Sequence, residues 1–284
     1  MKLGVVFPQT EIGPDPGDVR AYVEAVERAG FDHLAIYDHV LGAAGREGLN
    51  GPYRLNDQFH EVMVLFGYIA AITTRIELAT EVLVLPQRQA ALVAKQAAEI
   101  DLLTGGRLRL GVGIGWNPVE FEGLGMNFKD RARRFEEQIE LMRRLWSEPE
   151  VSFRGEHHAV DRAGLNPFPP RRIPIWIGAT ADAGLRRAAR MADGWQSELG
   201  LGPELEANLA RLRSYLAEYG RDAGSFGIAG EVGPGAQGVD EARRWQALGA
   251  THVSVTTMGG GLATAAAHIA ALLDFKQRWD EGGA

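Results

Sequence analysis

The chain has 284 residues, a formal net charge of −7, no cysteine and 45% hydrophobic residues. This length and composition suit one large α/β barrel or two small domains, and the lack of cysteine excludes disulfides, thiolate metal sites and cysteine nucleophiles. An acidic chain without a basic run is a poor nucleic-acid binder, and its apolar stretches stop well short of the ~18 residues that span a membrane. Because a strand is predicted directly after Met1-Lys2, we expect no signal peptide and a cytoplasmic protein.

Strand and helix patterns alternate from end to end. The expected strands lie at 3–7, 34–37, 76–80, 108–112, 175–177, 194–197, 226–229 and 252–256. The expected helices lie at 19–30, 60–73, 90–103, 135–146, 181–191, 203–219, 239–248 and 262–279. Parallel strands joined by helices are buried on both faces, which explains their continuous apolar runs. The pattern predicts the α/β class and a single (β/α)8 TIM barrel domain over residues 1–284.

Two stretches exceed an ordinary loop, and they place insertions after strands two and four. The first is 41–57, and the second is 117–128 together with a small hairpin at 151–160. Long loops in a compact domain are often binding lids.

Barrel enzymes place their sites at the C-terminal ends of the strands. Asp38 and His39 follow strand two, and a carboxylate beside an imidazole could handle a proton near neutral pH. The alternative is that Asp38 caps a loop and His39 packs under it. Other polar residues at strand ends are Gln9, Glu81, Glu198, Glu231 and Thr257.

A small-residue turn, Gly178-Ala179-Thr180, separates strand five from a helix at 181–191. Free backbone N–H groups and the helix dipole suit such a turn to a phosphate. The alternative is an ordinary turn in which Thr180 caps the helix.

Glycines at 111, 113 and 115 lie at and after the end of strand four, without the spacing of a nucleotide-binding loop. They fit better as space for a flat ring against the backbone, with Gly113 at the strand end.

Other site classes are weakly represented. A metal site needs several His and carboxylate ligands at strand ends, but only His39 is well placed, and His157 and His158 fall in the predicted hairpin. We therefore expect no metal. A glycosidase needs two facing carboxylates, for which the candidates are Asp38, Glu81 and Glu231.

Several motifs together resemble the luciferase-like monooxygenase superfamily, and within it the coenzyme F420-dependent oxidoreductases. They are AGFD at 29–32, YDHV at 37–40, LRLGVGIGW at 108–116, EFEGLG at 120–125, PIWIG at 174–178 and ADGW at 192–195. They span most of residues 3–196, whereas the remainder matches in layout more than in motif.

The resemblance implies a flavin or deazaflavin bound at the strand ends. Its phosphate would lie on Gly178, Ala179 and Thr180, and a carboxylate–histidine pair beside the reactive ring carbon would map onto Asp38 and His39. The family also implies a non-proline cis peptide near Glu81-Val82, where the glutamate departs from the family pattern. The expected cofactor-binding residues are Asp38, Glu81, Val82, Gly113, Gly178, Ala179 and Thr180.

The implied reaction is hydride transfer between F420 and a small organic substrate, with His39 handling a proton and Asp38 orienting it. The expected substrate pocket contains His60, Trp116 and Trp195. Arg46 and Arg54 in the long loop could meet an anionic cofactor tail.

Three other functions stay open. They are an FMN-dependent monooxygenase that needs oxygen and a separate reductase, a non-catalytic flavin-binding protein, and a barrel hydrolase. Similar proteins are often homodimers through helices near the second and third units, where Met63, Phe66 and Ile69 could form either the dimer face or core.

Overall fold

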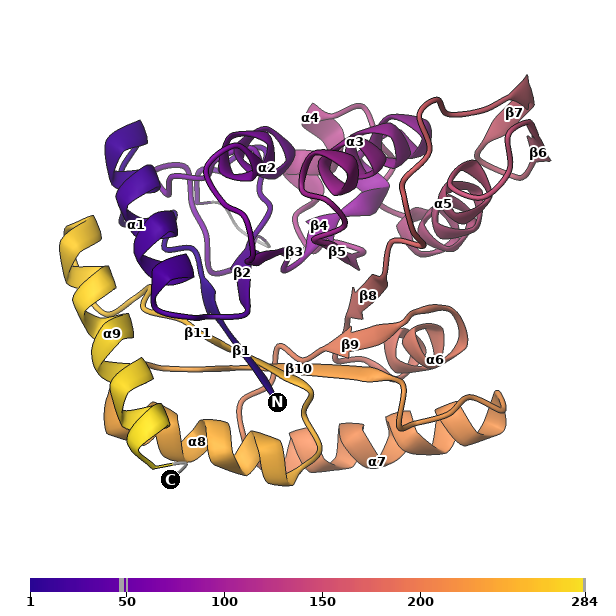
Figure 1. Cartoon of the computed structure of the whole chain (residues 1–284). Helices are drawn as coiled ribbons and strands as arrows, with labels where there is room; N and C mark the ends of the chain where they lie inside the picture. The colour runs from indigo at the N-terminus through magenta and orange to yellow at the C-terminus, as the bar shows by residue number, and fades with distance from the viewer. Residues whose placement is uncertain (46–48, 50, 283–284) are drawn as a thin grey trace.

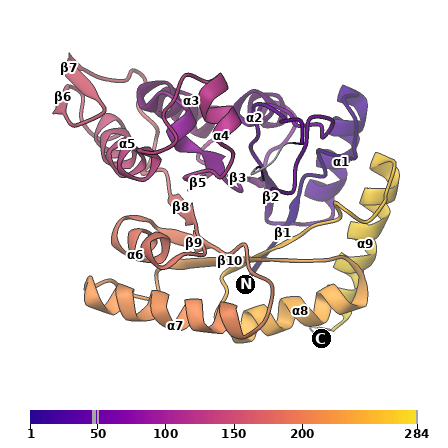
Figure 2. The same cartoon turned by 180° about the vertical axis from the view of Figure 1, so that it is seen from behind.

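The computed structural model describes residues 1–45, 49 and 51–282. Its main sheet is a closed parallel barrel (Figures 1 and 2). Pairing runs through β1 (Lys2–Val6), β2 (His33–Ile36), β3 (Glu77–Thr80), β5 (Leu108–Gly113), β8 (Ile175–Gly178), β9 (Gly194–Gln196), β10 (Gly227–Val232) and β11 (His252–Val255), and β11 returns to β1. The predicted barrel is therefore confirmed.

Helices surround the barrel on its outer side (Figure 1). They are α1 (Pro16–Arg28), α2 (Val62–Ala70), α3 (Ala90–Leu103), α4 (Pro118–Gly123), α5 (Arg131–Leu145), α6 (Asp182–Met191), α7 (Pro203–Glu218), α8 (Gly235–Ala247) and α9 (Ala265–Glu281). α1 shows why such helices form where they do. Asp15 accepts a hydrogen bond from the Gly17 backbone N–H at 2.6 Å, Pro16 opens the helix, and buried residues including Val19 and Tyr22 face the sheet.

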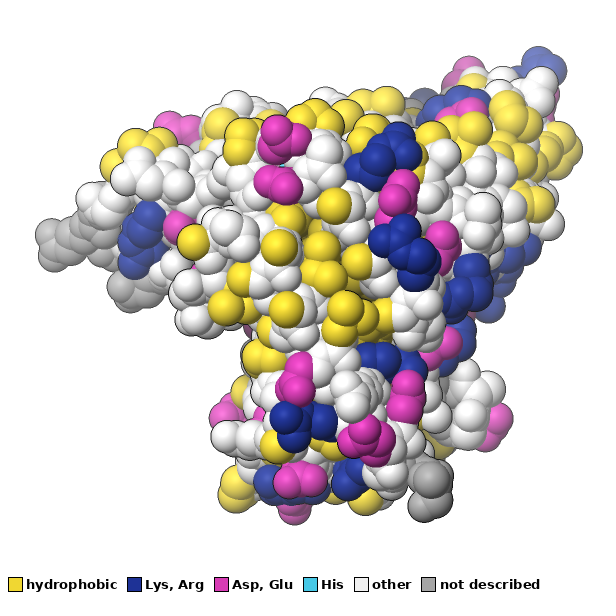
Figure 3. All heavy atoms as spheres, turned by 60° about the vertical axis from the view of Figure 1, so that its left-hand side comes forward, with side chains coloured by type: hydrophobic (Ala, Val, Ile, Leu, Met, Phe, Trp, Pro, Cys, Tyr) yellow, Lys and Arg dark blue, Asp and Glu magenta, His cyan; other side chains and the backbone are white. Residues whose placement is uncertain are grey.

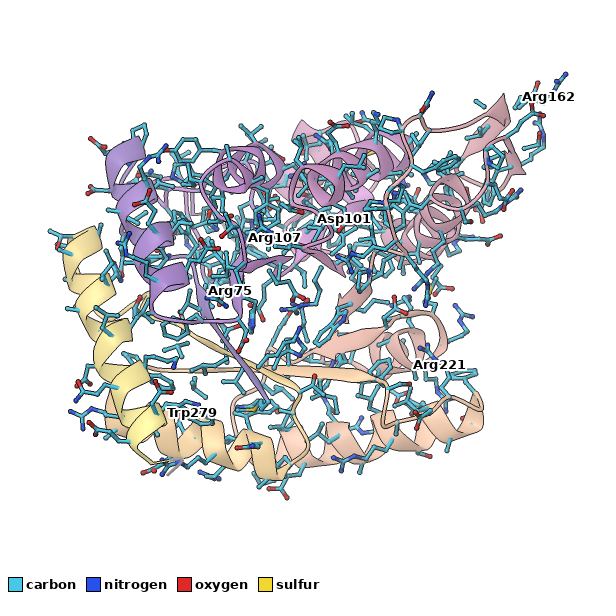
Figure 4. All side chains as sticks on the ribbon, viewed as in Figure 1. Arg75, Asp101, Arg107, Arg162, Arg221 and Trp279 are labelled. Carbon is cyan, nitrogen blue, oxygen red and sulfur yellow. The ribbon has the colours of Figure 1, made fainter. Side chains whose placement is uncertain are left out.

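The insertions lie where they were expected. The chain between β2 and α2 is the long loop, and α4 follows β5. The hairpin consists of β6 (Val151–Arg154) and β7 (Ala159–Ala163), paired antiparallel. It projects from the barrel beyond α5, with Arg162 at its outer end (Figure 4).

The third barrel strand is interrupted. β3 ends at Thr80, and the short β4 (Leu83–Val84) continues along β5 and leads into the 3-10 turn η1 (Leu85–Gln87). The peptide bond between Glu81 and Val82 is cis, as the family resemblance implied. A Cβ atom on Gly113 would lie 2.5 Å from Val82 Cγ2, and one on Gly178 would lie 2.8 Å from Val82 Cγ1. The two glycines therefore leave space for the Val82 side chain at the mouth of the barrel.

The main hydrophobic core lies between the sheet and the helices. Met63, Phe66 and Ile69 of α2 belong to this core, each at most 4% exposed, so they do not form an outer face. A smaller cluster of Val6, Ala35 and Ala79 lies inside the barrel. Among the helices of the described residues, none is long and apolar enough to cross a membrane.

Candidate functional site

His39 lies at the end of β2, and its partner comes from a distant part of the chain. Its Nδ1 is 3.0 Å from Oε2 of Glu120 in α4. The other oxygen of Glu120 accepts the backbone N–H groups of Val40 at 2.8 Å and Leu41 at 3.2 Å. Burial acts to raise the pKa of Glu120, but the hydrogen bonds from His39 and the two amides outweigh it and lower that pKa. Glu120 is therefore an anionic anchor for the imidazole.

Three aromatic rings surround His39. The ring centroids of Phe59, Tyr53 and Trp116 lie 4.9, 5.0 and 5.7 Å from that of the imidazole. Tyr53 and Phe59 belong to the long loop, which covers a small cavity that His39, Leu41 and Trp116 also line. The loop thus places aromatic side chains beside His39, and Trp116, which was expected in a substrate pocket, lines the same cavity.

The expectation that Asp38 orients His39 is wrong. The buried Asp38 carboxylate points the other way, accepting the Val84 backbone N–H at 3.0 Å and Nη2 of Arg88 at 2.7 Å. Arg88 also binds Glu61, the N-cap residue of α2, at 2.7 Å. Asp38 therefore fastens β2 to the β4–η1 segment and to α2, and Glu120 holds the histidine instead.

Glu81 and Glu231 lie near the C-terminal ends of barrel strands β3 and β10. Oε2 of Glu81 accepts a hydrogen bond from Ser254 at 3.3 Å, and Glu231 accepts one from Tyr37. Burial and the nearby Glu231 raise the pKa of Glu81 to about 8, and burial raises that of Glu231. These two carboxyls therefore favour the protonated form far more than ordinary glutamates do.

The small-residue turn is built as a backbone ledge. The helix after it begins at Asp182, and its N-cap, Ala181, has no side chain that could accept a hydrogen bond from the first-turn amides. The backbone carbonyl of Ala179 accepts Nε1 of Trp195 at 2.7 Å, and that of Thr180 accepts Nδ2 of Asn208 at 3.0 Å. Thr180 is therefore not the N-cap residue. Trp195 and Asn208 bind the carbonyls of the turn, and no side chain caps the backbone amides at the start of α6.

Trp195 does not line a substrate pocket. It is completely buried on the outer side of β9, so the expectation for this residue is wrong. His60 lies beside the mouth, where its backbone N–H contacts Oε1 of Gln9 at 3.3 Å and its ring is 6.0 Å from that of Phe7. The Arg54 guanidinium binds backbone carbonyls of its own loop, those of Gly51 and Tyr53. Arg46 lies outside the described residues.

Among the described residues, no group of three or more His, Cys, Asp or Glu side chains is arranged to hold a metal ion. The sequence reasoning missed the roles of Glu120 and Arg88. Glu120 stands two residues after the Asn117-Pro118 start of a short helix, a signal that places it near a helix N-terminus but not beside a particular histidine.

Comparison with known proteins gives a family match over nearly the whole chain. Residues 1–277 match the model of the luciferase-like monooxygenases. The uncharacterised protein Rv0940c of Mycobacterium tuberculosis is 36% identical over 205 residues, covering 70% of this chain and 71% of that protein. An F420-dependent glucose-6-phosphate dehydrogenase of Segniliparus rotundus is 31% identical over 219 residues, covering 75% and 62%. The structure of monooxygenase RslO1 from Streptomyces bottropensis superposes with a TM-score of 0.81 at 18% identity, covering 100% of both chains.

Proposed function

The chain belongs to the luciferase-like monooxygenase family, and on that premise we propose that it uses coenzyme F420 to transfer a hydride to or from a small organic substrate. The observation that carries the proposal is the His39–Glu120 pair, which lies under an aromatic cover at the C-terminal end of the barrel. The F420-dependent relative at 31% identity supports the choice of cofactor.

The residues at the mouth fit a phosphorylated ring cofactor. The Gly178-Ala179-Thr180 ledge offers backbone amides at a helix N-terminus to the phosphate. Gly113 and Gly178 leave space for the Val82 side chain, which would lie against the ring. When bound, the cofactor would supply hydride chemistry at its central ring, and the protein would supply position and electrostatics.

His39 would hold or move the proton that accompanies the hydride. Because Glu120 is a carboxylate that faces Nδ1, the neutral imidazole carries its proton on Nδ1, and Nε2 is left as the acceptor. Tyr53, Phe59 and Trp116 would exclude water from this nitrogen. The same three rings favour a small substrate with an apolar part.

The second candidate is an FMN-dependent monooxygenase, supplied with reduced flavin by a separate reductase. The observation that favours it is that the guanidinium of Arg54 is already bound to backbone carbonyls of its own loop. A non-catalytic flavin-binding protein would keep the phosphate ledge without using His39.

The test is an equilibrium titration of the purified chain with F420 and with FMN, each oxidised and reduced. Binding is measured by calorimetry and by fluorescence. Tight F420 binding with much weaker FMN binding is expected, and the reverse order would make the FMN enzyme the better description. Gly178→Asp should abolish binding of either cofactor, because a carboxylate would enter the anion site. His39→Asn should keep binding and lose turnover, whereas a carrier would show no difference.

A further inference from the structure

A hydrogen-bonded group of side chains lies inside the barrel below the mouth, apart from His39. Glu231 on β10 and Ser254 on β11 are register partners, and the Ser254 hydroxyl donates to Glu81 at 3.3 Å. Tyr37 donates to Glu231 from the opposite side. Ser254 is thus hydrogen-bonded to the carboxyl that follows β3 and is the register partner of the residue that carries the other.

The serine has a further partner on its other side. Nε2 of His33 is 3.0 Å from Ser254 Oγ. Gly4 stands between them in the register, and a Cβ atom there would overlap the His33 ring, so the glycine permits the contact. Burial, with the charges of Arg109 and His252, lowers the pKa of His33 well below its ordinary value. His33 is therefore a neutral hydrogen-bonding group and brings no positive charge.

The charged groups that face the two carboxyls do not neutralise them. Arg109 is the cation that acts on Glu81, but its guanidinium is bound to Glu77 at 2.6 Å and is 4.5 Å above the Trp176 ring. The other titratable groups that face Glu231 are Tyr37, Tyr53 and Glu198, and none of them is a cation. Two carboxyls that share a partly enclosed space without a cation of their own cannot both ionise cheaply.

We propose that Glu81 and Glu231 form a proton-holding pair that keeps one proton between them at neutral pH, as a second proton site beneath the one at His39. The proposal rests on the proposed function for its role. During turnover one proton would pass from the pair to a basic atom of the bound molecule, leaving both carboxyls ionised. A proton taken up from bulk solvent through water at the mouth would then restore the pair, so that each step moves one proton with its charge and no electron.

The protonated carboxyl can be observed directly, without cofactor or turnover. The infrared C=O band of carboxylic acids is recorded against pH on protein labelled with 13C-glutamate, which separates glutamate from aspartate signals. The wild-type chain should keep a glutamic-acid band at pH 7 that disappears as the pH rises. Glu81→Gln and Glu231→Gln should each move the loss of the band to lower pH, because the remaining carboxyl no longer faces a like charge, while its burial persists.

Glu122→Gln is the control, because Glu122 is exposed on α4 and does not act on either carboxyl of the pair. It should leave the pH 7 band unchanged. The absence of any band at pH 7, or a band that titrates at the wild-type pH in both pair variants, would overturn the proposal. Circular dichroism melting confirms that each variant is folded.

Cofactor titration of the same samples separates this proposal from the previous one. A protonated pair in a chain that binds neither F420 nor FMN would support the pair and refute the proposed function. Cofactor binding by a chain without a protonated glutamate would support the proposed function and refute the pair.

Discussion

At the scale of single residues, His39 shows how a side chain acquires a partner from the fold. Its sequence neighbour Asp38 faces Arg88, because consecutive residues at a strand end point to opposite sides. Glu120, far along the chain, reaches His39 and two loop amides at once. One carboxylate therefore sets both the position of the imidazole and the path of the chain that follows it.

Glu120→Gln should lower turnover by about 100-fold, because the amide can present N–H to Nδ1 and reverse the tautomer of His39. Cofactor affinity should stay within roughly threefold, since Glu120 is placed on the histidine rather than on the phosphate ledge. Steady-state kinetics and titration of the same preparation measure the two effects. Glu122→Gln, an exposed change on the same helix, is the control; equal losses in both variants would contradict the assigned role.

Glu81 predicts an unusual dependence of stability on pH. Its pKa is raised in the folded state, from an ordinary 4.5 to about 8, so the folded protein binds more protons than the unfolded chain between these values. Its contribution to stability is therefore complete below about pH 4.5 and is lost as the pH rises through 8. Relative to wild type, Glu81→Gln should gain about 2 kcal/mol in the free energy of unfolding between pH 5 and pH 9, less than the full shift would give because the side chain is partly accessible to water.

Urea denaturation at both pH values measures this difference. Glu77→Gln should give no such gain, because Arg109 and its other contacts outweigh the burial of Glu77 and lower the pKa of this carboxyl. A pH-independent difference between wild type and Glu81→Gln would show that Glu81 is ionised throughout.

At the scale of elements, the ion pairs of Arg88 join segments that share no backbone hydrogen bonds. Its guanidinium connects Asp38 after β2 with Glu61 at the start of α2. Arg88 itself follows η1, so its side chain joins η1 to the end of β2 and to the start of α2. The network fixes where the long loop departs from the barrel and where it returns.

Arg88→Met should lower the free energy of unfolding by about 3 kcal/mol, because it leaves the Asp38 carboxylate, 1% exposed, without its cation. The double variant with Asp38→Asn should recover part of this loss, since no buried charge remains. Arg133→Met, at an exposed pair with Glu156, should change stability by less than about 0.5 kcal/mol. Denaturant titration of the three variants measures their free energies of unfolding. A similar loss of stability in Arg88→Met and Arg133→Met would contradict the role assigned to the buried ion pair.

The sequence predicts elements better than contacts, for a physical reason. The spacing of hydrophobic residues and the glycines that end helices are features of short stretches of sequence. The barrel strands and most helices could therefore be located to within a few residues. The small-residue turn after β8 was also located, because a strand, small residues and a helix follow one another directly. The Glu120 and Arg88 contacts could not be found, because each joins residues whose proximity exists only after the barrel closes.

At the scale of the whole molecule, apolar side chains remain on the surface. Figure 3 shows hydrophobic side chains gathered across the middle of one face, between charged ones. On neighbouring helices α2 and α3, Val64 is 72% exposed and Leu92 is 53% exposed. Large exposed apolar groups on adjacent elements are typical of a contact with another molecule, and we expect that molecule to be a second copy of this chain.

The double variant Val64→Glu with Leu92→Glu should therefore convert a wild-type dimer into a monomer in light scattering after size exclusion. Leu273→Glu is the control, because this leucine is 45% exposed on α9, a helix that packs against α1 and α8. A wild-type monomer would contradict the expectation, and so would a dimer that persists in the double variant.

The indole of Trp195 has a practical consequence. It is fully buried and bound to the carbonyl of Ala179, the middle residue of the phosphate ledge, whereas Trp116 stands beside His39. The chain thus carries one intrinsic fluorophore under each half of its site. In a variant where only Trp195 is kept among the six tryptophans, the emission would report arrival of the phosphate, and in one that keeps only Trp116 it would report the substrate. Stopped-flow recordings of the two variants would then give the order in which the two molecules enter.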